Sequence, residues 1–368
     1  MTRAFGSALI LAALLLGGRV YLNVESSNPK VVEVDVSSAM LTAFRHDPTQ
    51  IRAQVLVPDS YAASPERRYP TIFWVHGFGG AYRFNPQSAG SWNDAMRAAG
   101  TEFIVVALDA SIETGHHVFA NSANNGSWGD ALVREFVPAL DRRFRTLATP
   151  QTRFLAGFSS GGWSVLWLQV NYPETFGGEW SLSPDPVDFH DFTGPDLWRE
   201  PPQNLYRAPD GRPYWLVRRN GRDVETLRDY VQADDGRPPP QRQFGSFDAV
   251  FSPRGADGQP EKLFDHETGA IDPTVERYWD VHYDIAHLVE KRWPTLKPEL
   301  RGKLHLIVGT EDTYHLEGSL HLFADELKHL GSDADVVFAP GYDHATIYEY
   351  DGGLIRHIVR QMAAMRER

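Results

Sequence analysis

A serine between glycines carries the strongest chemical signal in this sequence. The run from Phe154 to Gly162 reads Phe-Leu-Ala-Gly-Phe-Ser-Ser-Gly-Gly and contains a Gly-x-Ser-x-Gly pattern centred on Ser159. Residues 152–156 predict a buried strand, and the apolar residues after Gly162 recur at helical spacing. The two glycines let the chain turn sharply from strand to helix, which raises the serine hydroxyl above the end of the sheet. The pattern predicts a nucleophilic serine.

Two ionisable side chains that could assist this serine follow later strands. Residues 303–308 predict a strand that leads into Gly-Thr-Glu-Asp ending at Asp312, and residues 335–339 predict one that leads into Pro-Gly-Tyr-Asp-His ending at His344. Ligands of open parallel sheets bind at the carboxyl ends of the strands. His344 could take the serine proton and pass it to the leaving group while a carboxylate holds the imidazole tautomer. Serine, then acid, then histidine is the chain order of an α/β-hydrolase.

A glycine-rich loop upstream could supply the electrophilic part of such a site. Residues 69–75 predict a strand that ends in the run His-Gly-Phe-Gly-Gly over residues 76–80. Such a loop can aim a backbone N–H at a developing oxyanion, and the N–H of Ser160 would be the second donor.

Together these motifs resemble the putative-esterase family of α/β-hydrolases, which includes S-formylglutathione hydrolases, feruloyl and acetylxylan esterases, enterochelin-type esterases and mycolyltransferases. The resemblance covers residues 35–184 and 300–366 and includes a helix expected over residues 128–144, which a capping box from Ser127 to Asp130 would begin. It implies an α/β-hydrolase fold with a mostly parallel central sheet and helices on both faces. It also implies a serine esterase that works through an acyl-enzyme without a cofactor. The site residues that it implies are the triad Ser159, Asp312 and His344 and the oxyanion donors Phe78 and Ser160.

Other residues compete for the role of the acid. Asp185 and Asp188 follow the sixth predicted strand, residues 178–183, where some α/β-hydrolases place this residue, and Glu311 directly precedes Asp312. Asp312 is favoured by its position at the strand end. A metal site is not expected, because the 14 histidines include no His-Glu-x-x-His pair.

An inserted segment separates the sixth and seventh core strands. The predicted core comprises residues 31–184 and 300–368, and the insert comprises residues 185–299. The insert is rich in turn dipeptides and aromatic residues, among them Trp198, Trp215 and Trp279. It could form a lid or a substrate-binding wall, or its aromatics could simply build its own core.

An aromatic wall over the catalytic edge favours a bulky ester of a sugar or a phenolic acid, because aromatic faces stack on such rings. Two alternatives stay open. The acyl group could pass to a sugar hydroxyl, as in an acyltransferase of mycolyltransferase type, or the chain could be a non-catalytic carbohydrate binder with a relic site.

The composition excludes several other classes. A net charge of −12 without basic clusters argues against binding to nucleic acid or to anionic membrane surfaces. An apolar content of 42% suits a folded core, and the absence of cysteine excludes disulfides and thiolate nucleophiles.

The N-terminus predicts the compartment. A basic start is followed by residues 4–18, which carry no charge and many leucines. This length matches a secretory signal better than a spanning helix. We expect residues 1–18 to be a signal peptide or a signal anchor, and the protein to be periplasmic or secreted, with any membrane attachment through this segment. Beyond it, residues 31–36, 38–45 and 51–57 predict early antiparallel strands.

Overall fold

One eight-stranded sheet forms the centre of the protein. The computed structural model describes residues 30–200 and 204–366. The strand order is β1-β2-β4-β3-β9-β10-β13-β14. The sheet strands are β1 (Val31–Ser37), β2 (Gln50–Leu56), β3 (Thr71–Val75), β4 (Ile104–Leu108), β9 (Arg153–Phe158), β10 (Gly178–Leu182), β13 (Leu304–Gly309) and β14 (Asp335–Ala339). β2 pairs antiparallel with β1 and β4, and every pair from β4 to β14 is parallel. This is the predicted α/β architecture.

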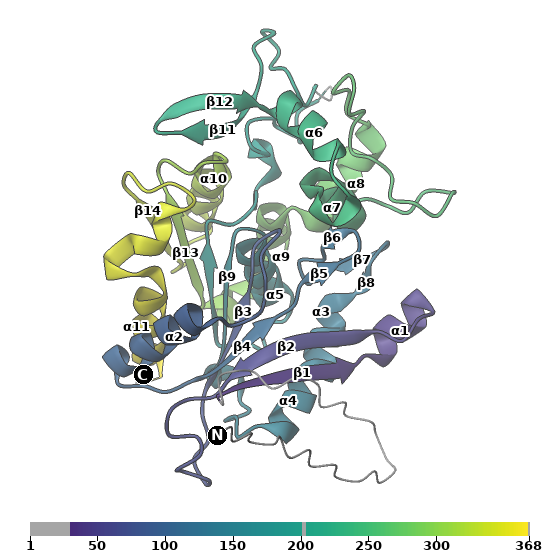
Figure 1. Ribbon diagram of the computed structural model, residues 1–368. Coiled ribbons are helices and arrows are strands. Elements are labelled where there is room, and N and C mark those ends of the chain that lie inside the picture. Colours follow the sequence, from purple (N-terminus) through teal and green to yellow (C-terminus); the bar gives the residue numbers. More distant parts are fainter. Residues whose placement is uncertain (1–29, 201–203, 367–368) are drawn as a thin grey trace, which may run out of the picture.

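Helices cover both faces of the sheet (Figure 1). The helices are α1 (Ala39–Arg45), α2 (Pro86–Ala99), α3 (Trp128–Ala131), α4 (Val137–Arg143), α5 (Ser160–Asn171), α6 (Leu227–Asp235), α7 (Gln243–Phe251), α8 (Pro273–Tyr283), α9 (Ile285–Leu300), α10 (Leu316–His329) and α11 (Leu354–Met365). α2 and α11 pack together on one face, and α5 and α9 pack together on the other. Side chains alternate along each strand, so Ile72 packs into the cluster with α2 and α11 whereas Phe73 packs into the opposite cluster.

The central strands are buried on both faces, as parallel strands between two helix layers must be. β4 reads Ile-Val-Val-Ala-Leu, and all five side chains are buried. Because both faces need apolar residues, the sequence of such a strand is a short continuous apolar run. This explains why the strands predicted from such runs are confirmed.

The segment of residues 38–45 was expected to be a strand and is a helix. The Ser38 hydroxyl accepts a hydrogen bond from the Leu41 N–H and caps the first turn. The Glu135 carboxylate accepts a hydrogen bond from the Ala39 N–H, which has no partner inside the helix. Cap and propensity therefore override the weak alternation of apolar residues along this short segment.

The helix expected over residues 128–144 is present as three consecutive segments, with a π-helical turn (Leu132–Phe136) between α3 and α4. Its predicted apolar stripe is buried, including Leu132, Phe136 and Leu140. Ser127 precedes the helix but its side chain makes no capping hydrogen bond, so the expected capping box is wrong.

The segment after β10 rises over the carboxyl ends of the strands, where β11 (Trp215–Arg219), β12 (Arg222–Thr226), α6, α7 and α8 lie at the top of Figure 1. Four short strands in two hairpins, β5 (Ser111–Ile112) with β6 (Gly115–His116) and β7 (Asn121–Ser122) with β8 (Gly126–Ser127), lie below α7. Most of the insert's aromatic side chains join one hydrophobic cluster with α5 and β13. The insert is thus packed onto the core through a continuous apolar interior.

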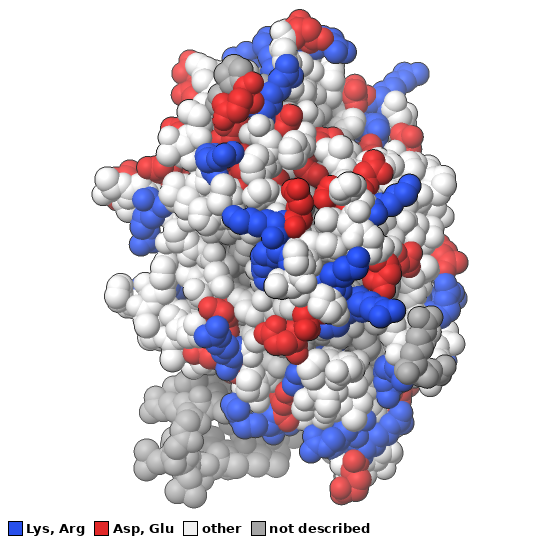
Figure 2. Space-filling model, turned by 180° about the vertical axis from the view of Figure 1, so that it is seen from behind, with Lys and Arg blue, Asp and Glu red and all other residues white. Residues whose placement is uncertain are grey.

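The N-terminal segment 1–18 lies outside the described residues. Within the described part of the chain, no helix has the length and apolarity needed to cross a membrane. Acidic and basic side chains are interspersed over the face drawn in Figure 2. The exclusion of nucleic acid as a partner stays a prediction from the sequence.

Candidate active site

The backbone turns sharply at Ser159, between β9 and α5. Ser159 has a φ of 58° and a ψ of −123°, a backbone conformation that residues other than glycine rarely adopt. The turn is tight on both sides: a Cβ atom at Gly157 would lie 2.1 Å from the carbonyl oxygen of Gly161, and one at Gly161 would lie 2.1 Å from that of Val75. Only glycine fits at these two positions, which explains the Gly-x-Ser-x-Gly spacing.

His344 and Asp312 come together from the ends of neighbouring strands. Asp312 follows β13, His344 follows β14, and His344 Nδ1 lies 2.7 Å from Asp312 Oδ2. Asp312 is fully buried, and its other oxygen accepts a hydrogen bond from the Tyr314 N–H. The carboxylate therefore orients the ring and favours the tautomer with a proton on Nδ1, which leaves Nε2 able to accept a proton.

Aromatic rings also hold the imidazole. The ring centroid of His344 lies 4.6 Å from that of Phe158 and 5.0 Å from that of Tyr314. His344 and Ser159 both line one cavity of about 490 Å³. The structure thus places a serine hydroxyl and an oriented imidazole on the wall of the same cavity.

The glycine-rich loop after β3 packs directly against the serine turn. A Cβ atom at Gly77 would lie 3.0 Å from both the Phe158 carbonyl oxygen and the Ser159 Cβ atom. Among the described residues, none accepts a backbone hydrogen bond from the N–H of Phe78 or of Ser160. Two N–H groups without partners beside a candidate nucleophile form a site suited to an oxyanion.

Two buried histidines hold this loop, and sequence reasoning did not assign them a role. His76 donates from Nδ1 to the Gly77 carbonyl and accepts at Nε2 from the Ala110 N–H. His116 donates from Nε2 to the His76 carbonyl over 2.9 Å. Burial holds the pKa of His116 well below its usual value, so the ring stays neutral and keeps this donor. His116 lies in a long polar loop, and no sequence pattern there indicates that it bonds to His76, 40 residues upstream.

The competing acid Asp185 lies in the cavity but is not the partner of the His344 Nδ1 atom. Its Oδ2 atom accepts a hydrogen bond from the Ser160 hydroxyl over 2.5 Å. Burial raises the pKa of Asp185 to about 6, and the Ser160 hydrogen bond and the nearby His344 oppose that rise. Asp185 is therefore a titratable group beside the serine turn.

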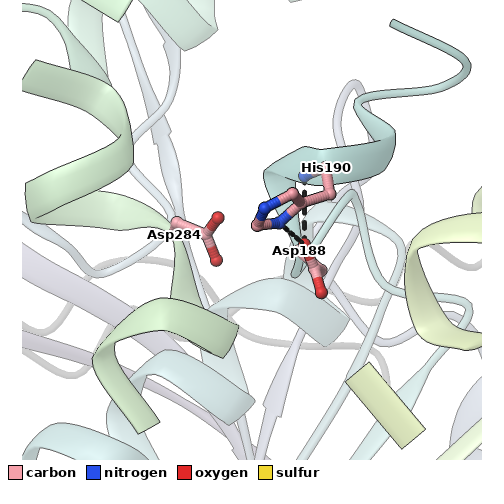
Figure 3. A group of neighbouring side chains, drawn as sticks. All are labelled: Asp188, His190 and Asp284. Carbon is pink, nitrogen blue, oxygen red and sulfur yellow. Dashed lines mark hydrogen bonds and ion pairs between the residues drawn. The ribbon is translucent and has the colours of Figure 1, made fainter. Parts of the chain in front are cut away.

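Asp188 and Glu311 make contacts elsewhere. Asp188 accepts hydrogen bonds from the backbone N–H and the Nδ1 atom of His190 (Figure 3). Glu311 lies 3.8 Å from the Arg218 guanidinium. Neither carboxylate contacts His344.

Asp188, His190 and Asp284 form the only group of described side chains whose atoms could share a metal ion, since their candidate ligand atoms lie within 4.8 Å of one another. In Figure 3, Asp188 and His190 belong to one short turn and face Asp284, which lies on a separate segment of the chain. Asp284 Oδ2 already accepts hydrogen bonds from the Phe189 N–H and from Trp198 Nε1. None of the three lines the cavity, so the group has no place in the chemistry there.

The insert forms one wall of the cavity, but with residues other than the expected tryptophans. Trp279 is buried and donates to Ser252, Trp198 donates to Asp284, and Trp215 is 40% exposed on β11. None of the three lines the cavity. Besides Asp185 and Pro186 at its start, the insert contributes Phe192, Thr193, Leu216, Tyr230, Arg237, Gln243, Phe244 and Phe247 to the lining.

Comparisons with known proteins agree with this architecture. The model of the family described as "Putative esterase" matches residues 48–236, just over half of the chain. A curated relative, the endo-1,4-beta-xylanase/feruloyl esterase of Xylanibacter ruminicola, is 28% identical over 145 residues, which is 35% of this chain and 19% of that protein. The chain thus spans only about a fifth of the length of that relative.

Solved structures share the fold. A ferulic acid esterase superposes with a TM-score of 0.57 at 16% identity, over 91% of this chain and 98% of the other. An S-formylglutathione hydrolase from Agrobacterium tumefaciens superposes with a TM-score of 0.51 at 14% identity, over 91% and 95% of the two chains. The family match shows that the chain belongs to the putative-esterase family, and the solved structures show that it has the α/β-hydrolase fold.

Proposed function

We propose that the protein is a serine carboxylic-ester hydrolase, in which Ser159, His344 and Asp312 form the catalytic triad and the N–H groups of Phe78 and Ser160 bind the oxyanion. The observation that carries this proposal is the 2.7 Å contact between His344 and Asp312 at the cavity that Ser159 lines. In this contact a buried carboxylate orients the imidazole so that its Nε2 atom can act as a base, which is the arrangement that activates a serine.

In this mechanism the Ser159 hydroxyl attacks the ester carbonyl and His344 takes its proton. The carbonyl oxygen becomes negative and is bound by the two backbone N–H groups. Collapse of the tetrahedral intermediate breaks the bond to the alcohol, which leaves with the proton from His344. Water then attacks the acyl-enzyme, gives its proton to His344, and releases the acid as the proton returns to Ser159.

We further propose that the substrate is a bulky ester with a phenolic or sugar component. The cavity of about 490 Å³ has aromatic side chains on both its core wall and its insert wall, including Trp74, Phe158, Phe244 and Phe247. Aromatic walls bind planar rings and the apolar faces of sugars. The curated relative is named a feruloyl esterase and a solved neighbour is a ferulic acid esterase, which favours the phenolic ester.

Replacement of the nucleophile tests the triad. Ser159→Ala should abolish both ester hydrolysis and labelling by a fluorophosphonate probe, while its circular dichroism and melting temperature stay those of the wild type. Ser91→Ala is the matched control, because its hydroxyl bonds to the Gln87 carbonyl on α2, away from the cavity. It should be labelled like the wild type. Turnover or labelling that persists in folded Ser159→Ala would refute the assignment.

We also propose that the protein is exported through residues 1–18, as a signal peptide or an uncleaved anchor. This rests on the uncharged, leucine-rich segment after a basic start. A reporter enzyme that is active only outside the cytoplasm should become active when fused behind residue 30, and an inactive fusion would contradict export.

A further inference from the structure

One cationic side chain lies in the insert wall of the cavity. Arg237 is the single lysine or arginine among the described residues that line the cavity. It lies just after α6, the helix that contains Tyr230 and the buried Asp234. Arg237 is exposed, with 44% of its side chain accessible, and an arginine retains its charge at every relevant pH, so the cavity carries a positive charge that an anionic ligand can reach.

The contacts of Arg237 do not use all its donors. One of its Nη atoms lies 3.5 Å from Asp234 Oδ1, and its guanidinium lies 5.8 Å from the ring centroid of Tyr230. The two oxygens of Asp234 also accept the backbone N–H groups of Gln243 and Phe244, each at 3.0 Å. A guanidinium has five N–H donors in a rigid fork, so this shared, long ion pair leaves donors for a ligand.

Two further polar groups adjoin the guanidinium. Burial raises the pKa of Tyr230 to about 12, so its phenol stays protonated, and it donates to Gln243 Oε1 over 3.1 Å. With Oε1 occupied, the Gln243 amide nitrogen is left as a donor. Tyr230, Arg237 and Gln243 all line the cavity. The insert therefore presents a cluster of donors with one positive charge.

Negative and positive side chains lie at different parts of the cavity. The carboxyl groups of Asp185 and Asp312 lie on the side of Ser159, where they disfavour an additional negative group. Arg237 lies on the insert wall, where it favours one. A substrate that carried an anion would be bound with its ester at the serine and its anion at the insert.

We propose that the Arg237, Tyr230 and Gln243 cluster is a subsite for a carboxylate, so that the preferred substrate is an ester whose acyl group or alcohol carries a carboxylate away from the scissile bond. This inference rests on the proposed function of the same cavity. A carboxylate fits the guanidinium fork through two parallel N–H···O bonds, and charge-assisted bonds of this kind are among the stronger ones in proteins.

Matched chromogenic esters test the subsite. The acyl arm compares the 4-nitrophenyl monoester of adipic acid with 4-nitrophenyl hexanoate. The alcohol arm compares 3-carboxy-4-nitrophenyl butanoate with 4-nitrophenyl butanoate. The readout is the ratio of kcat/KM for the anionic ester to that for its neutral partner. We expect this ratio to exceed one in at least one arm, which identifies the part of the substrate that bears the carboxylate, and to fall with added salt.

Substitution should then remove the preference. In Arg237→Gln the ratio should fall about 10- to 100-fold, the range of a charge-assisted hydrogen bond. Arg237→Lys should retain part of it, because the charge persists without the fork. Arg212→Gln is the control. This arginine belongs to the same insert, is 82% exposed, pairs with Asp210 and does not line the cavity. Its ratio should match the wild type.

The subsite is wrong if the wild type shows a ratio of one or less in both arms, or if folded Arg237→Gln keeps the wild-type ratio. Either result would leave the proposed triad intact. Failure of the triad would be seen instead as hydrolysis of both members of a pair by Ser159→Ala.

Discussion

The Ser160 hydroxyl donates a hydrogen bond to Oδ2 of Asp185 over 2.5 Å, joining the residue after the candidate nucleophile to the loop that follows β10. Ser160 is the residue whose N–H we assign to the oxyanion site, so Asp185 helps to fix that donor. Because the Asp185 carboxyl also lines the cavity and is buried, its protonation state changes the charge beside Ser159 and His344.

The first prediction is that Asp185 contributes to the pH dependence of catalysis. Its pKa of about 6 makes it anionic above that pH, and an anion near His344 favours the imidazolium that forms during reaction. In Asp185→Asn the rise in kcat/KM that accompanies ionisation of Asp185 near pH 6 should therefore disappear. The Asn side-chain oxygen can still accept from Ser160, so the change isolates the charge. If Asp185 had only a structural role, its substitution would lower the rate without changing the shape of the pH profile.

The second prediction concerns the carboxylate bound to His344. Asp312→Asn keeps the shape of the side chain but favours the wrong imidazole tautomer, so kcat should fall by several orders of magnitude, about 10⁴-fold if the site behaves like serine proteases. Asp188→Asn is the matched control, because Asp188 also follows β10 and accepts from a histidine, His190, that does not line the cavity. Single-turnover rates with a chromogenic ester measure both. A larger loss in Asp188→Asn or Asp185→Asn than in Asp312→Asn would transfer the acid to the sixth strand.

The framework of the candidate site could be predicted from the sequence because it depends on local constraints. Only glycine is accommodated at residues 157 and 161, and short apolar runs between polar turns mark the buried parallel strands. Each candidate group follows one of these strands directly. Since parallel strands end at one edge, the meeting of Asp312 and His344 follows from topology alone.

The parts that could not be predicted depend on long-range packing. The alternation in residues 38–45 suited a strand, but Glu135, almost 100 residues away, accepts N–H groups at the start of the helix. In the insert, the sequence does not show which aromatic residues line the cavity and which fill the interior. Trp279 is in the core whereas Phe244 reaches the cavity, and the difference lies in how α7 and α8 pack.

The third prediction concerns stability. Burial raises the pKa of Asp280 to about 9, helped by the nearby charges of Glu276 and Asp284. The folded state therefore keeps a proton that the unfolded state loses above its ordinary pKa of 3.8. Because the folded state binds more protons between these values, stability from this group is highest below pH 3.8 and declines as the pH rises toward 9, by up to about 1.4 kcal/mol per unit.

Asp280→Asn should remove this contribution, so that the melting temperature at pH 8 rises and its decline between pH 6 and pH 8 becomes shallower. The Oδ1 atom of Asp280 has no hydrogen-bond partner to lose. Asp325→Asn, on the exposed side of α10, serves as the control and should keep the wild-type slope. A melting temperature that falls equally steeply with pH in Asp280→Asn would show that the carboxyl is already ionised in the folded protein.

The fourth prediction tests the insert as a substrate-binding wall. Phe247 lines the cavity and packs against Phe192 and Phe244, with ring centroids 5.9 Å and 5.8 Å away. Leucine at this position keeps an apolar side chain but removes the ring face on which a phenolic or sugar group would stack. Binding energy from that remote contact can lower the barrier at the ester carbonyl. Phe247→Leu should therefore reduce kcat/KM for a feruloyl or acylated-sugar ester about tenfold more than for 4-nitrophenyl acetate, the difference expected for one aromatic contact.

Trp215→Leu provides the comparison, because this ring belongs to the same insert but is exposed on β11 and lies outside the cavity lining. Its two rates should keep the wild-type ratio. If Trp215→Leu changed the ratio and Phe247→Leu did not, the bulky group would bind along the β11–β12 hairpin instead. If formylglutathione proved a better substrate than either bulky ester, the aromatic wall would have no part in recognition, and its rings would serve only to pack the insert onto α5.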